Sequence, residues 1–230
     1  MPIYNPSLQS LSAAEVQRYA GMKEAHNFPP AAITAAVQEG RLLAEAKSSW
    51  EIFPYDSATS TILAERKIEL TATSIKRHLQ ASQHVVVLAV TIGELLEKTS
   101  EHYFAQGSYS HALLLDAAGT TAVEAAADQL EAFIRQQYAQ KGFICTRRFS
   151  PGYGNWDIRF QPEILRLANA GQVNITSTES CMLLPRKSVT AVIGLQPTYR
   201  QQKLQSNSTC STCSLTNCLS RREKRKDETN

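Results

Sequence analysis

The 230-residue sequence lacks any apolar run near the ~20 residues that a membrane-spanning helix needs, so we expect no membrane segment. Residues 1–5 also lack the basic and apolar regions of a secretory signal peptide. Both absences favour a cytoplasmic protein.

The chain has little net charge and few cysteines. Its formal charge is +3, and a basic cluster at residues 221–226 accounts for that excess, so the remainder is near neutral and nucleic-acid binding is not expected. The cysteines number five, an odd count. Three of them, Cys210, Cys213 and Cys218, lie close together near the C-terminus, which is more typical of metal or redox chemistry than of a disulfide framework.

The common nucleotide and metal motifs are also missing. No Walker-type Gly-Lys-Ser sequence is present. Gly152 and Gly154 resemble the start of a dinucleotide-binding fingerprint, but Asp157 occupies the position of its third glycine. No two of the five histidines have the spacing of a metal-binding pair, and no nucleophile-elbow motif supports serine catalysis.

Strand and helix patterns are mixed without regular alternation, which favours an α+β fold. We expect a helical N-terminal half packed with a twisted, largely antiparallel sheet made by residues 84–90, 143–149, 173–176 and 188–195. Residues 84–90 lack polar alternation, so that strand should be covered on both faces. Helices are predicted to start at Ala13 and Pro30, and to occupy residues 75–79, 94–104, 111–138 and 158–168. Composition places one domain at residues 1–198 and a polar, basic tail at 199–230.

The densest chemistry lies in residues 148–156, at the end of a predicted strand. Pro151 and Gly152 require a sharp turn, Gly152 and Gly154 allow a ligand close to the backbone, and Tyr153 offers a flat apolar face. Arg148 supplies a planar fork for a carboxylate or phosphate. The alternative is that Arg148 and Glu179 are paired surface residues that flank a structural turn.

Two further polar groups accompany this turn. Thr178, Glu179 and Ser180 concentrate hydroxyls and a carboxylate where another strand is expected to end, so that two loops on one sheet would form a cleft. In the predicted long helix, Glu124 shares a face with Asp128, four residues on. That spacing alone is more typical of a solvated polar stripe than of a site.

The order Arg-x-x-Pro-Gly-Tyr from Arg148, Thr-Glu-Ser from Thr178, and Pro-x-x-Ser-Val from Pro185 resembles the S-adenosylmethionine-binding activation domain of vitamin B12-dependent methionine synthase. The match is closest to short stand-alone versions of that domain and extends loosely over residues 11–197. The resemblance implies a helix bearing Asp116 and Glu124 beside the ligand cleft. It also implies that S-adenosylmethionine is bound by two groups of residues: Arg148, Pro151, Gly152, Tyr153 and Gly154, and Thr178, Glu179 and Ser180.

Within that resemblance, Arg148 suits the methionine carboxylate, the turn backbone suits the polar edges of the ligand, and Tyr153 suits a ring or ribose contact. Glu179 suits the sulfonium charge or the ribose hydroxyls. No residue is expected to act as a catalytic acid or base.

The family also implies partners. When the cobalt of the cobalamin cofactor is oxidised to Co(II), such a module docks over the corrin, an electron arrives from a flavodoxin or ferredoxin, and methylation from S-adenosylmethionine restores methylcobalamin. This chain has no Asp-x-His-x-x-Gly cobalamin-ligating motif, so cobalamin is expected on a separate methionine synthase chain. The protein would then be an accessory reactivation subunit of a methyltransferase.

The tail leaves an alternative open. Cys210, Cys213 and Cys218 are spaced to hold three positions of a zinc site or iron–sulfur cluster, with Cys145 or Cys181 as a fourth ligand, or they are free thiols on a flexible tail. With a cluster, the chain would be an electron-transfer module that activates another corrinoid methyltransferase.

A chain truncated after Pro197 tests the domain boundary, because the core patterns end before the tail cysteines. We expect its thermal unfolding to remain a single cooperative transition. A broad or absent transition in calorimetry would show that the tail belongs to the core.

Overall fold

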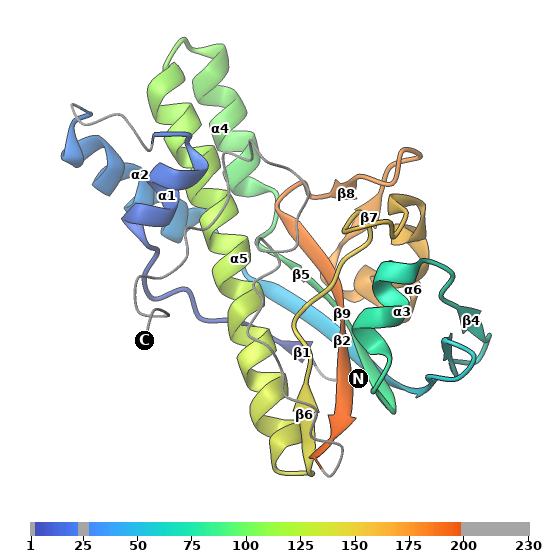
Figure 1. The fold of residues 1–230 in the computed structure, drawn as a ribbon. Coiled ribbons are helices and arrows are strands. Elements are labelled where there is room, and N and C mark those ends of the chain that lie inside the picture. Colours follow the sequence, from blue (N-terminus) through green and yellow to red (C-terminus); the bar gives the residue numbers. More distant parts are fainter. Residues whose placement is uncertain (1–2, 23–27, 199–230) are drawn as a thin grey trace.

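The computed structural model describes residues 3–22 and 28–198, which form helical layers on both faces of a seven-stranded sheet (Figure 1). The strands follow the order β4-β3-β2-β5-β9-β6, with β1 alongside β2, and every neighbouring pair is antiparallel. They are β1 (Ile3–Tyr4), β2 (Lys47–Asp56), β3 (Thr61–Ile62), β4 (Ile68–Glu69), β5 (His84–Thr91), β6 (Phe143–Cys145) and β9 (Ser188–Pro197). The predicted α+β class with an antiparallel sheet is confirmed.

The central strand β5 has the environment that its sequence predicts. It pairs along its whole length with β2 on one side and β9 on the other. Val85 and Val87 face one hydrophobic cluster while Val86 and Leu88 face another, and all four side chains are fully buried. A strand covered on both faces has no solvent side, which explains its continuous run of β-branched residues.

Different helices cover the two faces. On one face, α5 (Tyr109–Ala139) packs Leu130, Ile134 and Tyr138 against the sheet. On the other face lie α3 (Thr73–Leu79), α6 (Gln161–Leu167) and the 3₁₀ turns η1 (Ile158–Phe160) and η2 (Ala170–Val173). The sheet therefore separates two cores.

The first half of α5 extends beyond the sheet, and α1 (Ala13–Tyr19), α2 (Pro30–Leu43) and α4 (Leu95–Ala105) gather around it (Figure 1). The helix start predicted at Ala13 is confirmed, since the Ser12 hydroxyl accepts a hydrogen bond from the Glu15 N–H at 3.3 Å. None of the helices within residues 3–22 and 28–198 combines the length and apolar character needed to cross a bilayer.

Two predicted elements differ from the structure. Residues 173–176 were expected to join the main sheet, and this is wrong. Only β7 (Thr176–Ser177) is a strand there, and it pairs with β8 (Leu183–Leu184) in a separate two-stranded sheet. Val173 and Ile175 are buried in the core without strand pairing. Their burial explains why the segment has the apolar pattern of a strand. The strand predicted over 143–149 is regular only in β6, after which Phe149 pairs alone with Val192.

The division into residues 1–198 and a separate tail stays a prediction. Residues 199–230, with all three tail cysteines, lie outside the described residues.

Packing between α2 and α5 requires a glycine at position 40. A Cβ there would lie 2.7 Å from the Ala118 Cβ, which the backbone of α5 holds in place. Gly40→Ala should lower the free energy of unfolding by about 1–2 kcal/mol, because overpacking outweighs the better helix propensity of alanine. Denaturant unfolding measures this change.

Adding Ala118→Gly should recover part of that loss. The free energy of unfolding of the double variant should therefore be higher than the value obtained by adding the two single changes. Gly171→Ala is the matched control, since a Cβ at Gly171 meets no atom within 4 Å. If the effects of Gly40→Ala and Ala118→Gly simply add, the two positions do not compete for space.

Candidate functional site

The turn at residues 150–156 leaves the sheet at a fixed point. Phe149 and Val192 of β9 exchange two backbone hydrogen bonds, of 3.0 and 2.9 Å. The turn then closes with a 2.7 Å hydrogen bond from the Gly152 N–H to the Trp156 carbonyl. Gly152 has φ of +92°, a conformation that a residue with a Cβ rarely adopts. The sharp turn predicted here is therefore present in the fold.

Aromatic rings pack against one another within the turn and beside it. The Phe149 ring stacks against Trp156 at 6.2 Å and meets the ring of Tyr153 edge-on at 5.8 Å. Trp156 is buried, whereas Tyr153 is 44% exposed at the surface of the turn. The turn thus presents the Tyr153 ring to solvent, while Phe149 and Trp156 pack beneath it in the core.

Helix α3 holds the same segment at both ends. The Asn155 side chain accepts a hydrogen bond from the Ser74 N–H and donates one to the Thr73 hydroxyl, both at 2.9 Å, at the start of the helix. Near its end, the His78 ring donates from Nε2 to the Arg147 carbonyl at 2.8 Å. These contacts fix the backbone on both sides of the turn.

Arg148 points toward α5 and meets three carboxylates there. Its Nε donates to Glu131 Oε2 at 2.9 Å, and its Nη2 donates to Asp128 Oδ1 and, at 3.4 Å, to Glu124 Oε2. The Arg148 side chain is 15% exposed. Burial opposes its charge, but Glu124, Asp128 and Glu131 outweigh that effect and raise the pKa of Arg148 above its ordinary value. The guanidinium is thus charged and oriented.

Glu131 links Arg148 to a second arginine. Its other oxygen, Oε1, accepts from Arg135 Nη2 at 2.6 Å and from Nε at 3.0 Å. Arg135 also donates to the carbonyls of Cys145 and Thr146, both at 2.7 Å, in the segment just before Arg148. Glu131 and Arg135 therefore tie the last part of α5 to the extended segment between β6 and the turn, which carries Arg148.

The two residues predicted beside the cleft, Asp116 and Glu124, lie on the same stripe of α5. Glu124 contacts Arg148 as described. Asp116 pairs at 2.8 Å with the Nζ of Lys187, which also donates to the Thr120 hydroxyl at 2.9 Å. The stripe thus connects α5 with the turn on one side and the start of β9 on the other.

The predicted site lacks Asp128, Glu131, Arg135 and Lys187. For the residues on α5, the sequence signal is periodicity, because positions 116, 120, 124, 128, 131 and 135 share one helix face. A solvated stripe has the same spacing, so only the tertiary contacts distinguish the two.

The second predicted group, Thr178 to Ser180, forms the turn between β7 and β8. Thr178 Oγ1 lies 2.9 Å from Ser180 Oγ and accepts from the Met182 N–H at 3.1 Å, so both hydroxyls serve the turn itself. Glu179 is exposed. Among the described residues, no hydrogen bond or ion pair joins this hairpin to Arg148. The structure brings Arg148 together with Glu124, and leaves the hairpin as a separate group.

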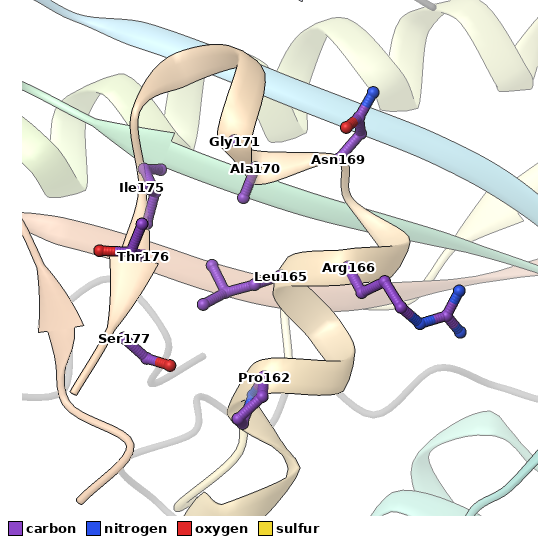
Figure 2. Close-up of a pocket in the computed structure, with 9 residues that line it drawn as sticks. All are labelled: Pro162, Leu165, Arg166, Asn169, Ala170, Gly171, Ile175, Thr176 and Ser177. Carbon is purple, nitrogen blue, oxygen red and sulfur yellow. The ribbon is translucent and has the colours of Figure 1, made fainter. Parts of the chain in front are cut away.

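A depression of about 350 Å³ lies between α6, η2 and β7 (Figure 2). Leu165 and Ile175 line its apolar part, and Arg166, Thr176 and Ser177 supply polar groups. It contains none of the predicted site residues, although Ser177 precedes Thr178. Of the motif residues, Arg148 contacts α5, the turn at residues 150–156 is held by α3, and Thr178 to Ser180 form the β7–β8 turn, so this hollow is a separate feature. Within residues 3–22 and 28–198, no three histidine, cysteine or acidic side chains are placed to hold a metal ion.

The architecture matches that of a solved reactivation domain. The chain is similar to "Crystal Structure of the MetH Reactivation Domain bound to AdoHcy", with a TM-score of 0.57 and 12% sequence identity, covering 87% of this chain and 80% of that one. At this identity the likeness establishes the fold alone. A search of curated proteins gave no match.

The family model for "Vitamin B12 dependent methionine synthase, activation domain" matches residues 65–208, more than half of the chain. The chain therefore belongs to this family, and the resemblance stated from its motifs is confirmed.

The anchor between His78 and Arg147 predicts a pH dependence. Burial lowers the pKa of His78 below 6.5, with the hydrogen bond to Arg147 opposing the shift. The unfolded chain therefore takes up a proton more readily, and stability present above about pH 6.5 is lost as the pH falls below that value. His78→Gln keeps an N–H donor but cannot titrate, so its stability should fall less steeply.

Urea unfolding of both proteins between about pH 7.5 and 5 measures this difference. Parallel curves for wild type and His78→Gln would contradict it.

Proposed function

We propose that this chain binds S-adenosylmethionine beside α5 and presents it to the cobalamin of a vitamin B12-dependent methionine synthase, so that an oxidised cofactor is methylated again. The cobalamin would be carried by another chain, and a flavodoxin or ferredoxin would supply the electron. The single observation that carries the proposal is the charged, oriented guanidinium of Arg148, which lies just before the turn that bears the exposed Tyr153, in a chain of the activation-domain family.

The residues around Arg148 fit the amino-acid end of this ligand. The Nη1 nitrogen of Arg148 has no hydrogen-bond acceptor among the described residues, so it is available for a carboxylate. The 3.4 Å contact from Arg148 to Glu124 is long for a hydrogen bond, so the Glu124 carboxylate has capacity left for the ligand's ammonium group. A zwitterion needs this combination of a cation and an anion side by side.

The remainder of the ligand has supporting groups nearby in sequence. The exposed ring of Tyr153 suits adenine or ribose, and the exposed Gly152 and Gly154 leave the turn backbone open to polar contacts. Glu179, with Thr178 and Ser180, would complete the site if the β7–β8 hairpin closes on the ligand. In that role Glu179 suits the sulfonium or the ribose hydroxyls.

The chain's own residues hold and orient the ligand, and none is proposed to act as acid or base. Bound S-adenosylmethionine supplies the methyl group. Arg148 fixes one end of the ligand, while its hydrogen bond to Glu131, which is itself bonded to Arg135, keeps Arg148 in place. Positioning of this kind is the contribution expected of an accessory reactivation subunit.

The electron-transfer alternative depends on Cys210, Cys213 and Cys218, which lie outside the described residues. No observation on the described part of the chain favours it. Iron or zinc bound to anaerobically purified protein, absent from a variant with all three cysteines replaced, would support a metal site on the tail.

Replacing Arg148 tests the proposed site directly. A charge-assisted bidentate contact contributes roughly 1.5–3 kcal/mol, so Arg148→Ala should weaken binding of S-adenosylmethionine by roughly ten- to a hundredfold. Arg148→Lys should restore only part, because lysine keeps the charge without the planar fork. Titration calorimetry with and without the cobalamin-bearing partner measures these affinities.

Arg159→Ala is the matched control, since Arg159 is an exposed arginine in η1 that pairs with Asp157. It should bind like the wild type. Equal binding by wild type and Arg148→Ala would place the ligand elsewhere.

A further inference from the structure

Asp128 differs from the other two carboxylates on Arg148 in how firmly it is held. Glu131 is 16% exposed and bonds two arginines, whereas Asp128 is 54% exposed and Arg148 is its only ionic or hydrogen-bond partner among the described residues. Because the Asp128 carboxylate is half exposed, water can screen its charge and replace Arg148 as its partner, although Arg148 itself is mostly buried. Asp128 can therefore leave Arg148 at small cost, while Glu131 cannot.

The position of Asp128 on the guanidinium has a direct consequence for a ligand. A bidentate carboxylate uses two neighbouring N–H groups of the arginine fork. Glu131 holds Nε, so the end of the fork formed by Nη1 and Nη2 is the remaining edge. Nη1 has no acceptor among the described residues, but Nη2 donates to Asp128. A ligand carboxylate can take both nitrogens only when Asp128 yields Nη2.

We propose that Asp128 occupies the place of the ligand's carboxylate on Arg148 in the unliganded chain, and so acts as an internal competitor that sets the affinity of the site. The proposal rests on the proposed function, because it takes Arg148 as the carboxylate-binding residue. Glu131 has the opposite role, since it orients the fork for the ligand.

The charge balance adds a specificity effect. Glu124, Asp128 and Glu131 carry three negative charges against the two positive charges of Arg135 and Arg148. Once displaced, Asp128 remains close enough to attract a cation. S-adenosylmethionine has a sulfonium charge that S-adenosylhomocysteine lacks, so removing Asp128 should favour S-adenosylhomocysteine more than S-adenosylmethionine.

The test is titration calorimetry of wild type and variants with both ligands, alone and with the cobalamin-bearing partner. With the half-exposed Asp128 as one partner, the pair contributes about 0.2–1 kcal/mol, so Asp128→Asn should tighten S-adenosylhomocysteine binding by roughly 1.5- to fivefold, with a smaller gain for S-adenosylmethionine. Asp128→Ala should have the same effect. It serves as a check, because an asparagine side chain could still accept a hydrogen bond from Arg148 and alanine cannot. Glu131→Gln should weaken both ligands.

Glu101→Gln is the matched control, because it removes the same charge from Glu101 of α4, which forms an exposed pair with Arg186. It should leave both affinities unchanged, and thermal melts should show that every variant is folded.

The outcomes separate the two proposals. If Arg148→Ala weakens binding but the Asp128 variants bind equally or more weakly than wild type, Asp128 is no competitor, and the proposed function still holds. If Arg148→Ala binds like wild type, or neither ligand binds in either setting, the proposed site fails and the role of Asp128 fails with it.

Discussion

The pairing of the Arg148 guanidinium with the carboxylates of α5 governs how the site is assembled. A charge that is mostly removed from water must be paired, since leaving it unpaired costs several kcal/mol. Arg148 follows β6 in the chain, and its partners come from a helix on one face of the sheet. The ion pairs therefore fix the turn at residues 150–156 relative to α5, while α3 fixes the same turn from the opposite face.

The sequence predicts the fold best where a segment's own pattern determines its environment. The continuous apolar run in β5 fits a strand that is buried on both faces, and the helical period in α5 fits a helix with one buried face. Both elements form as expected. Residues 173–176 alternate apolar and polar side chains, as a strand with one buried face does. There, a 3₁₀ turn and the irregular segment after it bury Val173 and Ile175 without pairing in the main sheet. A two-residue strand such as β7 has too short a pattern to be recognised, and it forms only as part of the local hairpin with β8.

For the site, the motif identified Arg148 and its turn but not their surroundings. The alternative that Arg148 and Glu179 form a surface pair is wrong, because Arg148 is mostly buried and pairs with Glu124, Asp128 and Glu131 of α5. Side chains on one helix face have the same spacing whether they meet solvent or an arginine. The hydroxyls of Thr178 and Ser180 show the converse case, because local turn bonding accounts for residues that also suit a ligand.

The pairing of β5 with β9 has a consequence for folding. His84 pairs with Leu195 and Thr91 with Ser188, so partners in the central ladder are roughly 100 residues apart in the chain. Such distant contacts are made late, because closing a long loop costs entropy before any pairing compensates it. During synthesis, β5 must wait with one edge unpaired until β9 leaves the ribosome. Until then the nascent chain exposes an apolar strand edge, and its protection from aggregation depends on whatever binds that edge in the meantime.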